Sequence, residues 1–315
     1  MLKNQIYEGK LEFILCDDNS KDRTKEIIYS AMKSDPRIKY VHSKAGDPNL
    51  SFKKRNLDAG INIASNDIML FTDMDCIIQP LWVKSMSKYF TDGVDYVVGF
   101  SKATNPKTLA ARFQKFDFFM LFAGARAMIN NNSPWACSGQ NQGYRKSLFN
   151  SVNGFNSLIG KLQGDDSLFL QICRNKKKTN VKFAYDDKAH VVCRSENKWL
   201  PLIKQRIRWS GDGNIMWQYN KIFYICLLSM FLANTGFIFL PFFAESISIV
   251  LVLLFLKYLF EYLLFTIANR EYKNQLKFYH FNEWFALQIP FVFIMGIGSF
   301  FANNISWRGK HLKKC

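Results

Sequence analysis

The sequence lacks the residue patterns that mark most metal-binding and nucleophilic sites. Its seven cysteines show no C-x-x-C spacing and no pairing pattern, and its four histidines are scattered over 315 residues. Because zinc needs such ligands at short, fixed spacings, the pattern supports neither a zinc site nor a Cys/His nucleophilic pair. A Ser/His/Asp arrangement, a phosphate-binding P-loop and an internal repeat are also lacking, and no cleavable signal peptide is visible. Reduced, mostly buried thiols are therefore expected, as in a chain that faces the cytosol.

Acidic residues are scarce as well. The 25 Asp and Glu residues against 42 Lys and Arg residues give a net charge of +17. Such a charge can indicate nucleic-acid binding, but no RNP, zinc-finger or helix-turn-helix pattern accompanies it. The basic residues instead cluster at 194–208 and 308–314, on either side of long apolar segments. This distribution is typical of a membrane protein that faces anionic lipid, so membrane adsorption is preferred and nucleic acid is not expected as a partner.

Long apolar segments dominate the chain after residue 221. Three of them approach the roughly 20 residues that cross a bilayer, at 222–244, 246–268 and 285–302. The second contains Lys257 and Glu261, which lie four residues apart on one helical face and can neutralise each other. Buried core helices are the alternative, and the length of consecutive apolar runs argues against it.

The orientation of these segments is less clear from the charge pattern. Basic residues follow both the second segment, at 270–277, and the third, at 308–314. Both groups are expected on the cytoplasmic side, which three full crossings cannot satisfy. Because Pro290 lies within the third segment, we expect that segment to be re-entrant or interfacial.

The first two hundred residues alternate between strand and helix patterns. Strands are expected at 11–16, 37–42, 67–72 and 96–100, and helices at 25–33, from Ser51 to about 64, and from Pro80. Short links between alternating elements predict an α/β fold with a doubly wound parallel sheet. A long Phe-rich helix is expected at 109–129, lying either against the membrane or on the sheet.

Two carboxylates, Asp73 and Asp75, stand at the end of the apolar run 68–71. The run is typical of a strand buried on both faces, and ligands gather where such strands end. Paired acidic groups there suit a divalent metal that holds a diphosphate. The alternative is a solvated turn, on which D-x-D is common.

Several further segments follow one another in a recognisable order. They are DDNSKDRT at 17–24, DMDC at 73–76, GYRK at 143–146 with VNGF at 152–155, GDD at 164–166, QRIRW at 205–209 and WRGK at 307–310. Together they resemble the motifs of membrane-bound family 2 glycosyltransferases of the Q-x-x-R-W type. The resemblance implies a GT-A (Rossmann-like) fold with a mostly parallel sheet flanked by helices, followed by C-terminal transmembrane or interfacial helices.

On the donor side, the resemblance implies roles for five residues. Asp18 would hydrogen-bond the nucleobase with Asp17 nearby, and Lys54 lies in a basic patch beside the nucleotide. Asp75, assisted by Asp73, would bind Mg²⁺ or Mn²⁺ bridging the diphosphate. A helix N-cap turn is the alternative for Asp17, and a solvated helical turn is the alternative for the basic patch.

On the acceptor side, the resemblance implies that Asp166 is the general base of an inverting transfer and that Asp165 contacts the acceptor. Arg208 would meet the departing diphosphate, Trp209 would wall the acceptor pocket and Gln205 would orient the acceptor. A helix N-cap is the alternative for Asp166. An interfacial helix with Arg and Trp at headgroup level is the alternative for the Q-x-x-R-W segment.

The sequence departs from the family pattern in two places. Relatives usually carry a strand and a helix before the D-D turn, whereas only residues 1–10 precede the first strand here. The expectation is a chain that lacks the first βα unit, with unpaired sheet edges as the consequence. The second departure is at 165–168, where relatives often show a further acidic residue, which leaves the acceptor type open.

These features predict a domain order and a function. A GT-A catalytic domain at 1–198 precedes an interfacial helix at 199–220, membrane helices at 221–306 and a basic cytoplasmic tail at 307–315. The expected activity is transfer of a sugar, from UDP, to a lipid-linked or glycan acceptor at the cell membrane, with the catalytic domain in the cytoplasm. The alternatives are a processive polysaccharide synthase of the same family and an inactive, truncated fragment.

Overall fold

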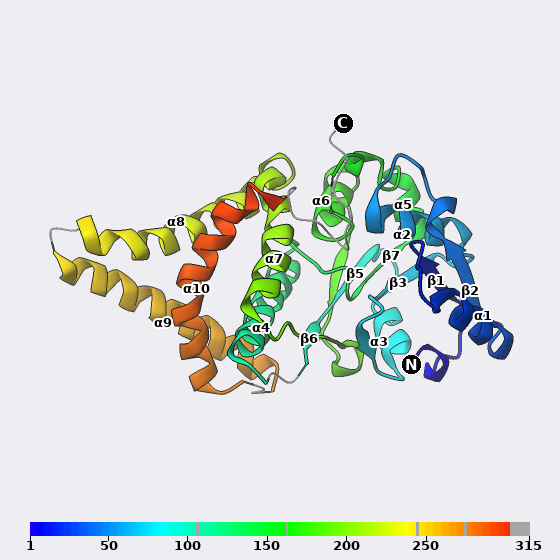
Figure 1. The fold of residues 1–315 in the computed structure, drawn as a ribbon, viewed down its shortest axis with the longest axis horizontal. Coiled ribbons are helices and arrows are strands. Elements are labelled where there is room, and N and C mark those ends of the chain that lie inside the picture. The colour runs from blue at the N-terminus through cyan, green and yellow to red at the C-terminus, as the bar shows by residue number, and fades with distance from the viewer. Residues whose placement is uncertain (105–106, 162, 244–245, 274–275, 303–315) are drawn as a thin grey trace. The chain divides into compact units, whose positions relative to one another are not determined.

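The chain divides into two compact units in the computed structural model, which describes residues 1–104, 107–161, 163–243, 246–273 and 276–302 (Figure 1). The first unit comprises Met1–Ser101 and Ala125–Cys193, and the second comprises Lys102–Gly124 and Arg194–Lys313. The predicted domain boundary at 198 falls near the second junction, but the segment 102–124 groups with the C-terminal helices instead of the sheet.

The first unit begins with a parallel βαβ element. Strand β1 (Phe13–Asp17), helix α1 (Thr24–Ser34) and strand β2 (Ile38–His42) agree with the elements expected there. The strands pair in parallel from Phe13 opposite Ile38 to Asp17 opposite His42. Helix α2 (Phe52–Ile63) follows, with Ser51 at its N-cap position as expected, and it packs on β1 and β2. A right-handed crossover through a helix is the usual way to join parallel strands.

A four-stranded sheet forms the centre of the first unit. Its order is β3 (Ile68–Phe71), β7 (Gln142–Arg145), β5 (Tyr96–Gly99) and β8 (Val181–Ala184). Strand β7 is antiparallel to both of its neighbours, whereas β5 and β8 are parallel. The prediction of α/β sheets flanked by helices is confirmed, but the sheet is mixed instead of mostly parallel.

The sequence did not predict β7 because Gln142-Gly-Tyr-Arg145 carries no apolar run. The chain reaches β7 from the long helix α4 (Leu109–Asn130) and re-enters the sheet in the opposite direction between β3 and β5. Strands β1 and β2 form a separate two-stranded sheet, in which β1 pairs with β2 alone among the described strands. Strand β3 ends at Phe71, two residues before Asp73.

The remaining elements of the first unit are short. A further antiparallel pair joins β4 (Cys76–Ile78) to β9 (Val191–Cys193), and β6 (Ser101–Ala103) begins at the last residue of the unit's first segment. The helices are η1 (Leu2–Asn4), η2 (Ser43–Ala45), α3 (Trp82–Ser87), α5 (Lys146–Ser151), η3 (Asn156–Leu158), α6 (Ser167–Lys176) and η4 (Asp187–Ala189).

An aromatic cluster around Tyr144 of β7 forms the core beneath the sheet. Its ring is stacked on Phe71 at 4.5 Å between centroids and lies 5.1 Å from Phe169 of α6 and 5.3 Å from Tyr96 of β5. Tyr96, Tyr144 and Phe169 are fully buried. Burial of such rings stabilises a fold by a few kcal/mol each, roughly 25 cal/mol per Å² of apolar surface. The cluster therefore holds the ends of β3 and α6, which carry the acidic residues, in a fixed arrangement.

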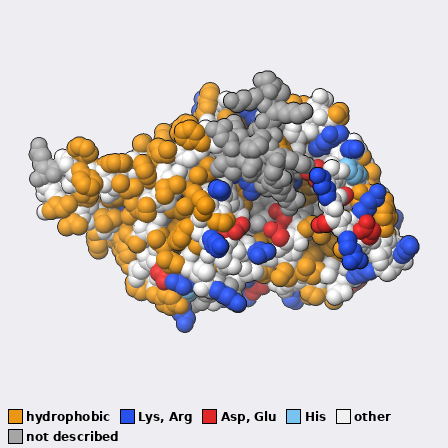
Figure 2. Space-filling view, viewed as in Figure 1, with side chains coloured by type: hydrophobic (Ala, Val, Ile, Leu, Met, Phe, Trp, Pro, Cys, Tyr) orange, Lys and Arg blue, Asp and Glu red, His pale blue; other side chains and the backbone are white. Residues whose placement is uncertain are grey.

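The second unit is helical. It contains residues 109–124 of α4, α7 (Trp199–Ser210), η5 (Gly211–Gln218), α8 (Lys221–Phe243), α9 (Ile247–Glu271) and α10 (Phe278–Ser299). Among the described residues, α8, α9 and α10 are long and apolar enough to cross a membrane. Figure 2 shows the apolar side chains that α8 and α9 leave uncovered.

Helix α10 is continuous through Pro290, so the break that a re-entrant segment requires is not observed within it. It packs against α7 and α8. In the most apolar 18-residue stretch of α10, 33% is buried, whereas 6% of the corresponding stretch is buried in α8 and in α9. The pairing expected inside α9 is present, with Lys257 Nζ 2.8 Å from Glu261 Oε1, and Gln288 of α10 also donates to Glu261. The predicted tail at 307–315 and its WRGK segment lie outside the described residues.

Helix α4 carries its phenylalanines toward other helices of the second unit. Phe113 lies 4.6 Å from Phe291, and Phe116 lies 5.1 Å from Phe265 and 5.2 Å from Trp284, measured between ring centroids. Aromatic contacts at these distances stabilise helix packing beyond simple burial. Residues 109–124 of the Phe-rich segment therefore pack among helices of the second unit.

A buried lysine of α2, Lys54, is expected to stabilise the first unit through hydrogen bonds to backbone carbonyl groups. Lys54 is 1% exposed, and its ammonium donates to the carbonyl oxygens of Lys161 and Gln163 at 2.7 and 3.1 Å. We predict that Lys54→Met lowers the melting temperature in detergent by about 5 °C, because buried carbonyl groups lose charged donors. Lys33→Met, on the exposed surface of α1, is the matched control and should leave the melting temperature unchanged. An equal shift in both variants would contradict the role of Lys54.

Candidate active site

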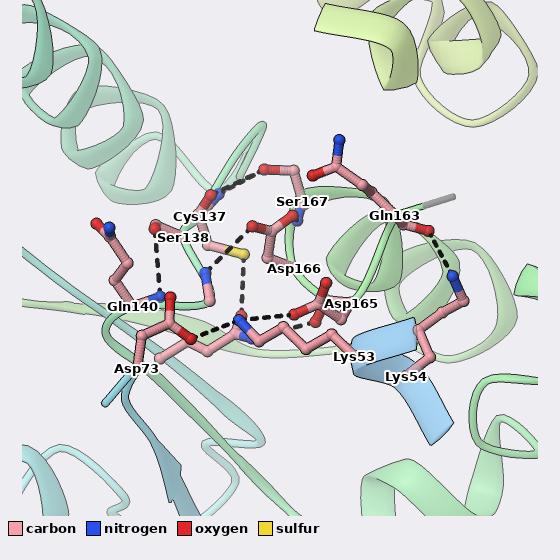
Figure 3. Close-up of polar contacts among 12 residues, drawn as sticks. Lys53, Lys54, Asp73, Cys137, Ser138, Gln140, Gln163, Asp165, Asp166 and Ser167 are labelled. Carbon is pink, nitrogen blue, oxygen red and sulfur yellow. Dashed lines mark hydrogen bonds and ion pairs between the residues drawn. The ribbon is translucent and has the colours of Figure 1, made fainter. Parts of the chain in front are cut away.

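Acidic residues from two distant parts of the sequence meet around one ammonium group. Lys53 Nζ lies 2.8 Å from Asp73 Oδ1 and 3.2 Å from Asp165 Oδ2 (Figure 3). Asp73 follows β3, Asp165 precedes α6, and Lys53 comes from the first turn of α2. Burial alone would lower the pKa of Lys53, but the negative charges of Asp165 and Asp73 outweigh it and raise that pKa. The ammonium therefore stays charged and links the end of β3 to the start of α6.

Asp166 lies beside this ion-paired cluster. Its Oδ1 accepts from the backbone N–H of Ser167 at 2.6 Å, and its Oδ2 accepts from that of Gly139 at 3.1 Å. Burial and the charge of Asp165 raise the pKa of Asp166 to about 6, although Lys53 and the two backbone N–H groups oppose the shift. Asp166 is also the N-cap residue of α6. The N-cap geometry and a carboxylate that ionises near neutral pH thus occur in the same residue.

The loop between α4 and β7 completes this site, and sequence reasoning missed it. Cys137 donates its N–H to Ser167 Oγ at 3.1 Å, and Ser167 Oγ donates back to the Cys137 carbonyl at 2.9 Å. Gln142 Nε2 donates to the carbonyl of Asp165 at 3.1 Å. The segment Ser133-Pro-Trp-Ala-Cys-Ser-Gly139 has the Pro and Gly content of a loop, which was the one available signal.

Gly139 lets the loop approach the carboxylates closely. A Cβ atom at this position would lie 2.7 Å from Lys53 Nζ and 3.0 Å from Asp165 Oδ2, closer than van der Waals contact allows. Any other residue would displace one partner of the ion pair. The backbone N–H of Gly139 donates to Asp166, and a Cβ atom here would lie 3.8 Å from Asp166 Oδ2, an ordinary contact distance.

Asp17 is the last residue of β1, and Asp18 follows it in the same unit. Asp17 is buried, accepting from the Ser20 N–H at 3.0 Å and from the Tyr40 hydroxyl at 3.1 Å. Burial would raise the pKa of Asp17, but these hydrogen bonds outweigh it and lower the pKa. Asp17 therefore closes the turn after β1, whereas Asp22, not Asp17, accepts from the N–H of Thr24 at the start of α1. Asp18, which is half-buried, directly follows β1.

Helix α2 connects that turn to the carboxylate cluster. Asn56 Nδ2 donates to the carbonyl of Cys16 in β1 at 3.1 Å. Lys53 precedes Asn56 by three residues, so both side chains lie on one face of the helix. The end of β1 and the end of β3 are therefore both tied to the same face of α2.

Lys54, predicted to lie beside the nucleotide, is buried in this structure. It points to the carbonyl oxygens of Lys161 and Gln163, and the neighbouring Lys53 reaches the acidic residues instead. Consecutive helical residues point about 100° apart, so only one of the two can face the cluster. The residue pattern alone did not distinguish them.

The D-x-D carboxylates differ in their surroundings. Asp73 is engaged by Lys53, whereas Asp75 is exposed on the turn before β4. The described residues contain no group of three or more His, Cys, Asp or Glu side chains arranged to hold a metal ion. Mg²⁺ is commonly held by one or two carboxylates while substrate phosphates and water complete its shell. An exposed Asp75 with a half-exposed Asp73 fits that mode of binding, and not a closed protein cage.

The predicted acceptor residues of the Q-x-x-R-W segment lie on α7, in the second unit. Gln205 Oε1 accepts from Gln114 Nε2 of α4 at 3.2 Å. Trp209 is stacked on Phe118 of α4, with ring centroids 5.8 Å apart and an interplanar angle of 16°. Arg208 lies on the same helix beside Trp209. The segment is therefore a helix that packs on α4 within the second unit.

We predict that Lys53→Met destabilises the protein in a pH-dependent way. Asp166 has a raised pKa, so its ionisation costs stability as the pH rises from about 4 through about 6. Without the ammonium of Lys53, the repulsion among Asp73, Asp165 and Asp166 grows in the ionised state. The fall in melting temperature relative to wild type should be larger at pH 8 than at pH 5.

The exposed Lys33→Met variant should show the same small difference at both pH values. If Lys53→Met lost the same number of degrees at pH 5 and pH 8, the ammonium would not be balancing these carboxylates.

Part of the sequence is similar to known glycosyltransferases. Residues 1–152 match the family model described as Glycosyl transferase family 2. Over 98 residues, 31% of this chain, the sequence is 30% identical to the GalNAc(5)-diNAcBac-PP-undecaprenol beta-1,3-glucosyltransferase of Campylobacter jejuni subsp. jejuni serotype O:2. The match spans 30% of that relative's length.

A solved crystal structure of a mycobacterial protein is also similar, at 20% identity and a TM-score of 0.37, covering 61% of this chain and 59% of that chain. The family match includes Lys53, Asp73 and Asp75 and ends before Asp165. The family match and the glucosyltransferase relative together support a family 2 glycosyltransferase.

Proposed function

We propose that this chain transfers a sugar from a nucleoside-diphosphate donor, expected to be UDP, to a hydroxyl group of a lipid-linked or glycan acceptor. The observation that carries the proposal is the carboxylate Asp166, whose pKa is raised to about 6 beside the Lys53 ion pair. A general base works best when its pKa lies near the operating pH. The family match supports the choice of reaction class.

Asp166 would accept the proton of the acceptor hydroxyl while its oxygen attacks the anomeric carbon. Attack from the face opposite the leaving group inverts the configuration of that carbon. Both oxygens of Asp166 already accept backbone N–H groups, from Ser167 and Gly139, so the carboxylate is held in one orientation. A base held in this way loses little entropy when the acceptor arrives.

Donor binding is proposed for the carboxyl ends of β1 and β3. Asp18 would hydrogen-bond the nucleobase, with Asp17 shaping the turn that presents it. Asp75, with Asp73, would hold Mg²⁺ or Mn²⁺, which neutralises charge that develops on the leaving diphosphate. Lys53 replaces Lys54 in this proposal as the cation beside the diphosphate, because its ammonium lies among the carboxylates.

Acceptor binding is proposed for Asp165 and the Q-x-x-R-W helix. Trp209 would pack against the acceptor, Gln205 would orient it, and Arg208 would contact the departing diphosphate. A lipid-linked acceptor is favoured because the Campylobacter relative is named for a PP-undecaprenol substrate and because α8, α9 and α10 can cross a membrane. We accordingly propose the cell membrane as its location, with the catalytic unit on the cytoplasmic side.

The test is a screen of radiolabelled nucleotide sugars with the detergent-solubilised protein and polyprenyl-diphosphate acceptors. We expect one donor to label the acceptor, with kcat/KM falling below pH 6 because protonated Asp166 cannot accept a proton. Asp166→Asn should lower kcat by about 100-fold or more. Asp92→Asn, at an exposed position, is the matched control and should retain full turnover.

Full turnover by Asp166→Asn would remove the base assignment. The length of the labelled product separates single transfer from processive synthesis, since the latter yields a polymer. Absence of transfer from every nucleotide sugar would favour the inactive-fragment alternative.

A further inference from the structure

A buried ion pair joins three helices of the second unit. Asp117 Oδ2 of α4 lies 2.8 Å from Arg206 Nη2 of α7, and Asp117 Oδ1 accepts from Trp284 Nε1 of α10 at 3.5 Å. The side chain of Arg206 is 8% exposed and that of Asp117 is 18% exposed. Water is therefore largely excluded from the pair, which connects the Q-x-x-R-W helix α7 to α4 and α10.

Stability alone is a weak reason for such a pair. Burial raises the pKa of Asp117 and lowers that of Arg206, so each group resists its charged form and the partner only partly compensates. Well-packed apolar residues at such positions are commonly as stable or more stable, whereas removing one partner is strongly destabilising. The ion pair is therefore expected to have a role other than stabilising the fold.

The guanidinium group of Arg206 also contacts two aromatic rings. Its central carbon lies 4.5 Å from the ring centroid of Phe118 and 4.8 Å from that of Trp209. The two rings are nearly parallel, at 16°. Arg206 and Trp209 are three residues apart on α7, so they share a face of the helix. A planar guanidinium beside two aromatic rings restrains the rotation of the indole through cation–π contact.

We infer that Asp117 and Arg206 are positioning residues for the acceptor: the ion pair fixes the guanidinium, and the guanidinium fixes the orientation of Trp209. Arg206 itself touches neither sugar nor nucleotide in this scheme. The inference rests on the proposed function, since the acceptor contact of Trp209 is part of that proposal.

The experiment compares Arg206→Met with the double variant Asp117→Leu/Arg206→Met in the full chain. Arg206→Met leaves Asp117 buried without its partner and should lower the melting temperature and raise the acceptor KM about tenfold, with the donor KM unchanged. The double variant removes both charges, so the melting temperature should recover while the acceptor KM stays high. Arg112→Met breaks the ion pair with Glu283 between α4 and α10, and as matched control should leave the acceptor KM unchanged.

The Trp209→Ala background supplies a second comparison. There Arg206→Met should change the acceptor KM less than about twofold, because the indole it orients is gone. Recovery of both the melting temperature and the acceptor KM in the double variant would overturn the inference and leave the pair a purely structural contact.

A readout independent of turnover separates this inference from the proposed function. With 5-fluorotryptophan incorporated, the ¹⁹F resonance of Trp209, assigned from Trp209→Phe, should shift and broaden in Arg206→Met and in the double variant. An unchanged resonance contradicts the inference even in an active enzyme. A shifted resonance in a protein that transfers no sugar would support the positioning contact and refute only the proposed function.

Discussion

The candidate site depends on one cation placed among carboxylates. The ammonium of Lys53 lies between Asp73, at the end of β3, and Asp165, at the start of α6. Without a positive charge, these groups and Asp166 would repel one another within a partly dehydrated space. The ion pairs therefore hold together two parts of the first unit whose residues are about ninety positions apart in the sequence.

Two parts of the surrounding fold support this arrangement. In the aromatic core, Tyr144 packs on Phe71 and Phe169, which fixes β3 and α6 relative to each other. The loop before β7 adds a second support, because Gly139 donates a backbone N–H to Asp166 and has no Cβ atom to crowd Lys53 and Asp165. The aromatic core and the loop thus determine the environment that raises the pKa of Asp166 to about 6. A surface carboxylate without these neighbours would ionise near its ordinary value.

In the second unit, polar and aromatic contacts combine in a similar way. Asp117 links α4, α7 and α10 through Arg206 and Trp284, and the same guanidinium lies against Trp209. Helices α8 and α9 leave most of their apolar surface uncovered, as expected for segments that contact lipid. The ion pair of Asp117 with Arg206 thus lies next to the Q-x-x-R-W residues, and a second polar group, Lys257 with Glu261 and Gln288, joins α9 to α10.

The sequence by itself determined the elements with strong local signals: β1, α1, β2, α2, β3 and the long apolar helices, together with the carboxylates at strand ends and the family. Periodicity and apolar runs are local properties, so they are readable from residue order. Only the tertiary structure decided that β7 enters antiparallel, that Lys53 and not Lys54 faces the acidic residues, and that Gly139 and Asp117 complete the two groups of contacts. Each of these features depends on which distant segments meet, and residue order does not specify that. Two neighbouring lysines have the same local pattern, and a polar strand has no apolar run that marks it, so long-range packing decides both.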